Sequence, residues 1–169
     1  MTNYTFRDVA EEDIPNLAKL HATAWKETYE LIYPDQTNWP TAELREWQWR
    51  ELFKQNPKTW FCYVVENADR ELIGFAKGQD YNHENYPGIR GELNKIYLLR
   101  KYHKQGLGLQ LFKAVVTNFI SKGVNNMILF SDPDNPTTLF FESLGGKKSF
   151  AVNGDFHGAY TWDSLALFK

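Results

Sequence analysis

Apolar residues recur along the chain with two different periods, and their alternation predicts a mixed α/β protein. A short segment at residues 4–8 alternates apolar and polar side chains, which is typical of a half-buried strand. Two segments with helical spacing follow. One covers residues 14–28 and stops at Pro34, and the other runs from Thr41 to just before Pro57.

The middle of the chain predicts a β-hairpin and then a third strand. β-rich segments at residues 60–66 and 71–77 flank a short turn at 67–70. A polar loop is expected over residues 79–88, because asparagine, proline and glycine gather there. Residues 93–99 form the next predicted strand.

The clearest helix covers residues 106–122, where apolar side chains repeat along one face. The strand predicted at 126–131 must run parallel to the strand before that helix, because a helix of about four turns separates the two. A short helix at 137–144 and strands near 148–152 and 160–165 complete the chain. The order βααβββαβαββ predicts an α/β fold with a mixed sheet that is antiparallel early and parallel at its centre.

Composition narrows the class of protein. A chain of 169 residues, 43% hydrophobic and 24% charged, is expected to form one soluble domain over residues 1–169. The net charge of −2 argues against nucleic acid or an anionic membrane as a partner. No segment approaches the roughly 18 apolar residues of a spanning helix, and no signal peptide is apparent. The single cysteine, Cys62, cannot form an internal disulfide, so we expect a cytoplasmic protein.

Candidate chemistry begins where a strand leads through a basic loop into a glycine-containing helix start. Gly106 and Gly108 let the backbone approach a ligand closely, and the first N–H groups of the helix lack partners within it. Such a helix start binds phosphate, helped by the helix dipole. The same loop carries three cations, Arg100, Lys101 and Lys104.

Other phosphate and catalytic sites fit less well. A dinucleotide fingerprint would need a third glycine where Leu111 stands and an acid after the strand at 127–130. The lysine of a P-loop and the Gly-x-Ser-x-Gly turn of serine hydrolases are both missing. The four histidines and Cys62 do not have metal-ligand spacing, so we predict no metal site.

Three blocks of the sequence resemble the GNAT family of N-acetyltransferases, in the order in which that family has them. The first joins Glu92-Leu-Asn-Lys-Ile-Tyr-Leu98 to His103-Lys-Gln-Gly-Leu-Gly108, with His103 in place of the usual Gln or Arg. The second is Asp134-Asn-Pro-Thr-Thr-Leu-Phe-Phe-Glu-Ser-Leu-Gly145, and a weaker third runs from Trp25 to Pro34. The predicted order of elements is also the order of this family.

The resemblance implies an acyl-CoA site between two parallel strands that splay apart at a bulge in the first. Backbone groups at 96–98 would pair with the pantetheine arm, and the Leu98 N–H would polarise the thioester carbonyl, a contribution of about 3 kcal/mol. Residues 103–108 would hold the pyrophosphate. The residues implied at the cofactor are Ile96, Tyr97, Leu98, His103, Lys104, Gln105, Gly106, Leu107, Gly108, Asp134, Asn135 and Phe141.

The implied reaction is direct attack of a primary amine, from a small molecule or a peptide, on acetyl-CoA as co-substrate. Such an amine is mostly ammonium at neutral pH, and its deprotonation costs roughly 4–5 kcal/mol. Glu92 corresponds to the carboxylate that serves as base, although a solvent-facing strand acid would look the same. The usual acid is a tyrosine where this chain has Phe141, so solvent or another tyrosine would reprotonate the thiolate. A catalytically silent acyl-CoA-binding module is the alternative.

The acceptor wall is expected to include Trp25 and Tyr29, for which plain core packing is the alternative. His21 lies on an apolar stripe and is expected to be a satisfied histidine in the core or at a pocket edge. Three acidic residues would suit a cationic polyamine or amino-sugar, although such charges usually form a solvated helix face: Glu27, Glu30 and Asp35. A homodimer through the last strands or a sheet edge is expected from the family alone.

Overall fold

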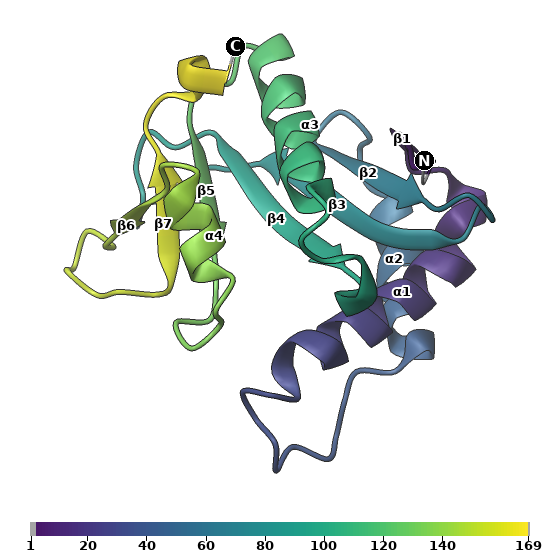
Figure 1. Cartoon of the computed structure of the whole chain (residues 1–169). Coiled ribbons are helices and arrows are strands. Elements are labelled where there is room, and N and C mark those ends of the chain that lie inside the picture. Colours follow the sequence, from purple (N-terminus) through teal and green to yellow (C-terminus); the bar gives the residue numbers. More distant parts are fainter. Residues whose placement is uncertain (1–2, 169) are drawn as a thin grey trace.

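The computed structural model describes residues 3–168, in which all strands belong to one seven-stranded sheet (Figure 1). The sheet has the order β1-β2-β3-β4-β5-β7-β6. Neighbouring strands are antiparallel except β4 and β5, which are parallel as predicted. The strands are β1 (Thr5–Asp8), β2 (Trp60–Glu66), β3 (Leu72–Asp80), β4 (Gly91–Leu98), β5 (Met127–Phe130), β6 (Lys147–Ser149) and β7 (Ala159–Trp162).

Helices cover both faces of the sheet. One face is covered by α1 (Ile14–Tyr29) and α2 (Ala42–Phe53), and the other by α3 (Leu107–Ser121) and the short α4 (Thr138–Ser143) (Figure 1). Sequence signals set their ends: α1 has a proline in its first turn, and the Thr41 side chain caps α2 by accepting the Leu44 N–H. Within residues 3–168, no helix has the length and apolar character needed to cross a membrane.

The predicted order of elements is confirmed, and three boundaries are corrected. The loop expected from residue 79 starts later, because the last residues of β3, up to Asp80, still pair with β4. The predicted strand 148–152 is shorter, because the N–H groups of Ala151 and Val152 donate to Asp155 and Asn85 instead of to β7. The last strand ends at residue 162, and residues 165–168 form a 3₁₀ helix.

The sheet separates two apolar clusters. The cluster on the α3 face joins side chains of α3, such as Phe112 and Phe119, to Leu93 of β4. The cluster on the α1/α2 face joins α1 and α2 to Phe75 and includes Cys62. Cys62 is 2% exposed, and burial raises the pKa of its thiol, as expected of an unreactive core cysteine.

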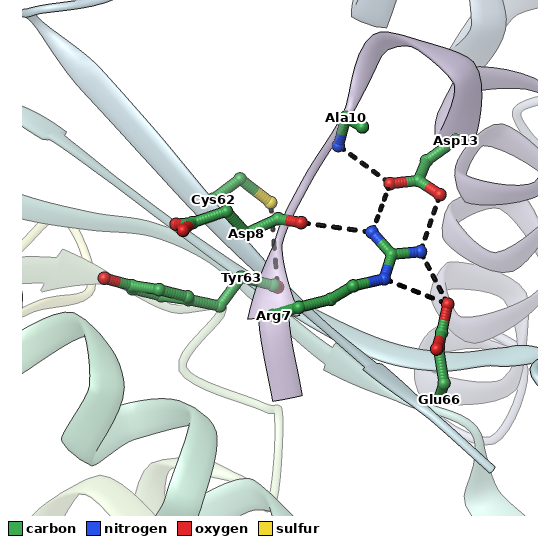
Figure 2. Close-up of polar contacts among 7 residues, drawn as sticks. All are labelled: Arg7, Asp8, Ala10, Asp13, Cys62, Tyr63 and Glu66. Atoms are coloured by element: carbon green, nitrogen blue, oxygen red, sulfur yellow. Dashed lines mark hydrogen bonds and ion pairs between the residues drawn. The ribbon is translucent and has the colours of Figure 1, made fainter. Parts of the chain in front are cut away.

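An ion-pair network attaches the start of α1 to the sheet (Figure 2). The Arg7 guanidinium donates to both carboxylate oxygens of Asp13, at 2.7 and 2.8 Å, and to Glu66 Oε1 at 2.6 Å. Asp13 also accepts the Ala10 N–H at 2.8 Å. The hydrogen bonds from Arg7 hold the pKa of Asp13 below its usual value.

We expect Asp13→Asn to lower the free energy of unfolding by about 2 kcal/mol at neutral pH, because hydrogen bonds to charged groups contribute about 1.5–3 kcal/mol. The folded-state pKa of Asp13 is lowered, so its contribution is complete above the unfolded pKa of about 3.9. It is lost as the pH falls through the lower folded pKa. Urea unfolding of both proteins at neutral and acidic pH measures this difference.

The matched control is Asp8→Asn, because Asp8 is exposed and gives only its backbone carbonyl to the Arg7 network. This variant should unfold as the wild type does. If the difference between wild type and Asp13→Asn does not shrink in acid, the charge of Asp13 is not the source of the stabilisation.

Candidate active site

The central parallel strands separate soon after they pair. Gly91 and Glu92 of β4 pair with Met127 and Ile128 of β5, and no further position is paired between them in the described part of the chain. The register of β4 with β3 shifts at Asn94, which has no partner in β3. A bulge of this kind bends a strand and increases its twist. The predicted bulge and divergence therefore meet at one point of β4.

A cavity of about 410 Å³ lies between the diverging strands, and we call it the β4–β5 cavity. Its walls come from β4, the start of α3, the segment from β5 through α4, and the end of α1. The lining residues are Thr28, Tyr29, Leu93, Asn94, Lys95, Ile96, Tyr97, Leu98, His103, Lys104, Gly106, Gly108, Leu109, Leu129, Phe130, Ser131, Asn135, Thr137, Phe140 and Phe141.

The loop that enters α3 has the backbone of an anion site. Lys104 has φ +59° and Gly106 has φ +79°, so both lie in the left-handed region. Apart from its chain neighbours, a Cβ atom built on Gly106 would have no heavy atom of the described residues within 4 Å, which leaves the space before the first turn of α3 open. His103 Nε2 donates to the Leu98 carbonyl at 2.8 Å and fastens the loop to the end of β4. Open space, glycine and free helical N–H groups together suit a phosphate.

Most residues predicted at the cofactor line the β4–β5 cavity, but three lie outside its lining. Leu107 is 1% exposed in the α3 core. Gln105 is exposed and accepts a hydrogen bond from the Tyr4 hydroxyl at 2.6 Å. Asp134 is exposed in the turn before α4, where its N–H donates to Asp132.

Of the basic residues in the loop, Lys104 lines the cavity and Arg100 does not. The Arg100 backbone N–H donates to the Glu27 carboxylate at 2.7 Å, and its guanidinium contacts Glu30 at 3.0 Å. These two carboxylates therefore bind groups of the protein itself, Glu27 the backbone and Glu30 the side chain of Arg100. They give no support to the expectation of a cationic acceptor.

Phe141 has no hydroxyl, but two tyrosines line the same cavity. Phe141 lines the β4–β5 cavity, as predicted from its place in the sequence, and so do Tyr29 and Tyr97. Burial raises the pKa of both tyrosines. Both hydroxyls are therefore protonated at neutral pH and can each donate a hydrogen bond.

Glu92 lies beside the cavity rather than in its lining. Its carboxylate accepts the Gln79 amide at 2.6 Å and the Asn94 amide at 3.1 Å, and Asn94 does line the cavity. Trp25 also lies outside the lining. The centroid of its ring lies 4.6 Å from the centroid of the Tyr29 ring and 4.7 Å from Cζ of Arg45.

A second cavity, of about 300 Å³, lies between α2 and the sheet, and we call it the α2 cavity. Lys95 lines both cavities, so that they adjoin at β4. No prediction was made for this cavity from the sequence. Its lining residues are His21, Arg45, Trp47, Gln48, Trp49, Glu51, Leu52, Gln55, Lys77 and Lys95.

His21 lies at the edge of the α2 cavity but is not satisfied, which corrects half of the expectation. It is 1% exposed, and neither ring nitrogen has a hydrogen-bond partner among residues 3–168. The reason is its surroundings, since its ring faces the rings of Trp49, Phe75 and Tyr97 at centroid distances of 5.2–6.0 Å. Burial, helped by Arg45, lowers the pKa of His21 to about 2, so the imidazole is neutral.

Comparison with known proteins agrees with the geometry. The chain is 26% identical to the uncharacterized N-acetyltransferase YuaI of Bacillus subtilis (strain 168) over 172 residues, which cover 98% of this chain and 96% of that protein. The structure of PaiA N-acetyltransferase from Thermoplasma acidophilum in complex with coenzyme A has a TM-score of 0.67 at 21% identity, over 94% of this chain and 98% of that one.

An N-acetyltransferase from Staphylococcus aureus Mu50 has a TM-score of 0.70 at 17% identity, with 96% of this chain and 99% of that chain covered. These structures share the mixed sheet with its parallel central pair. The family model described as "Acetyltransferase (GNAT) family" matches residues 24–145, which is more than half of the sequence. The chain therefore belongs to the GNAT acetyltransferase family.

Proposed function

We propose that the protein transfers an acetyl group from acetyl-CoA to the primary amine of a small molecule or peptide. The observation that carries this proposal is the β4–β5 cavity, which ends at the glycine loop of α3. The related PaiA structure is a complex with coenzyme A, which supports an acyl-CoA as the ligand of the corresponding cavity here.

The cavity supplies each part of such a ligand with a suitable surface. Beyond Glu92, the edge of β4 that faces β5 has no partner strand in the described part of the chain, so its backbone groups can pair with the amides of an extended arm. The Leu98 carbonyl is bonded by His103, which shows that the backbone of Leu98 faces away from β3. We assign to its N–H the polarisation of the thioester carbonyl. Lys104 and the first turn of α3 would hold the pyrophosphate.

In this proposal, Glu92 is the base that deprotonates the acceptor amine. Hydrogen bonds from Gln79 and Asn94 fix the carboxylate at the point where the strands part. Because Glu92 does not line the cavity, one water beside Asn94 would carry the proton to it. The thiolate leaves readily, since a thiol pKa of about 8.5 makes it a good leaving group. Solvent, or a hydroxyl of the half-buried Tyr29 and Tyr97 that line the same cavity, then reprotonates the thiolate.

Calorimetric titration with acetyl-CoA, with NAD as the control ligand, tests the cofactor site. We expect saturable binding of acetyl-CoA and no response to NAD. Release of free CoA in the presence of a broad panel of amines then tests transfer. Binding without CoA release for every amine would contradict transfer and favour a silent acyl-CoA-binding module, whereas no binding at all would contradict the cofactor site itself.

A further inference from the structure

The α2 cavity has an excess of positive charge. Arg45, Lys77 and Lys95 line it, and Glu51 is the carboxylate in its lining. Glu51 is itself paired with Lys54 at 2.5 Å, outside the cavity. The cavity wall therefore carries more cationic than anionic groups.

Two of these cations, Arg45 and Lys77, are buried, and their partners within the chain do not neutralise them. Arg45 is 7% exposed and donates to the Gln48 amide oxygen at 2.9 Å, while its Nε has no partner in the described part of the chain. Lys77 is 5% exposed, and its amine donates to the amide oxygens of Gln79 and Asn94. Amides accept hydrogen bonds but carry no negative charge.

Burial of an uncompensated charge is costly, and this cost lowers the pKa of the two lysines. Burial, together with the nearby Lys95, lowers the pKa of Lys77 to about 8. The pKa of Lys95 is lowered for the same reasons, burial first and then Arg45. Glu92 acts in the opposite direction on both lysines, but its carboxylate is already engaged by Gln79 and Asn94. A bound anion would supply the missing negative charge.

The position of the α2 cavity relates such an anion to the reaction. Lys95 lines both cavities, and an acceptor with its amine beside the thioester and its other end at Arg45 would pass Lys95. The planar guanidinium matches a carboxylate with two hydrogen bonds. The neutral His21 ring adds one N–H donor and no charge.

We propose that the acceptor is an amino carboxylate, an amine whose carboxylate binds Arg45 and Lys77 in the α2 cavity. This inference rests on the acetyl transfer proposed above, and it extends that proposal to the class of substrate. The same cations would repel a polyamine, because its second ammonium group would have to enter a cavity that is already positive.

Matched pairs of amines test the proposal. Each pair compares an amino carboxylate, such as γ-aminobutyrate, δ-aminovalerate or glycine, with the compound in which an amide replaces its carboxylate. Aminoethylphosphonate and putrescine are tested beside these pairs. The wild type should prefer the carboxylate by at least about tenfold in kcat/KM, as one good charge-assisted interaction supplies. Arg45→Gln should remove most of that preference, chiefly through a higher KM for the carboxylate.

The control is Arg50→Gln on the same helix, because Arg50 is exposed and pairs with Glu46 at 2.7 Å. It should leave both kcat/KM values unchanged. Lys77→Met is the second variant if Arg45→Gln fails to fold. A wild-type preference for the amide or putrescine, or an equal loss for both members of a pair in Arg45→Gln, overturns the proposal. A preference for the phosphonate overturns the carboxylate in favour of a phosphate group.

A binding measurement separates this inference from the acetyl transfer on which it rests. Calorimetry of the wild type with δ-aminovalerate and with its amide should show binding that depends on the carboxylate and is lost in Arg45→Gln. Carboxylate binding without CoA release from acetyl-CoA would support the anion site while contradicting transfer. If no carboxylate of the panel binds, the proposed class of acceptor is overturned, whether or not other amines are acetylated.

Discussion

Gly106→Val is expected to abolish measurable binding of acetyl-CoA. Gly106 has φ +79°, a conformation in which a β-branched residue is strained by about 1–3 kcal/mol. The valine side chain would also project into the open space before α3, where we expect the pyrophosphate, since no heavy atom of residues 3–168 lies within 4 Å of its Cβ position apart from its chain neighbours. Calorimetric titration with acetyl-CoA measures the loss, and circular dichroism shows whether the fold is retained.

Gly154→Val is the matched control for this experiment. Gly154 has φ +89° and an equally open Cβ position, but it lies in the turn between β6 and β7. The control therefore has the same backbone strain at a place remote from the glycine loop. If Gly106→Val binds acetyl-CoA as tightly as Gly154→Val does, the pyrophosphate does not lie in this loop.

Glu92→Gln is expected to lower turnover by about 10²- to 10⁴-fold while acetyl-CoA binding is retained, because general base catalysis contributes about that much. The loss should be largest at low pH, where the acceptor amine is most protonated and most needs a base. The pH dependence of kcat/KM for an amine that the wild type acetylates measures it. A variant whose pH profile matches that of the wild type would exclude Glu92 as the base.

Gln79→Ala separates the charge of Glu92 from its packing. This change removes the hydrogen bond that Gln79 donates to Glu92 at 2.6 Å and the one that it accepts from Lys77, but it keeps the carboxylate and its bond from Asn94. Gln79→Ala leaves the base in place but less well oriented, so it should lower turnover much less than Glu92→Gln, which removes the base. An equal loss in the two variants would mean that Glu92 acts by holding the strand.

Local patterns in the sequence predict much of the fold and the position of the glycine loop. The helix α3 combines an apolar face with Gly106 at its start, and both are legible without tertiary structure. The lining of the β4–β5 cavity was less accessible, because it depends on where β4 and β5 part. A polar pair, Asn94-Lys95, between the apolar Leu93 and Ile96 was the available sign that this strand borders a cavity.

Contacts between distant segments explain what the sequence did not reveal. Arg100 was expected to add charge for a phosphate, but it binds Glu30, which lies 70 positions earlier in the chain. The sequence indicates no role for Arg45, because Arg45 lines a cavity with Lys77 and Lys95 only once α2 packs on the sheet. Helical periodicity shows which face of a helix is apolar, but it does not show which cations from other elements the helix will meet.

The division of the core by the sheet has a consequence for how this protein can change. The buried side chains under α1 and α2 and those under α3 form separate sets, so a substitution in one reaches the other through the strands between them and through Leu99, which packs against both. Effects of distant substitutions are nearly additive. Helix α2, none of whose residues line the β4–β5 cavity, can therefore acquire new side chains, one after another, without loosening the half that holds the glycine loop. This independence makes the chain a suitable starting point for directed evolution toward other amines.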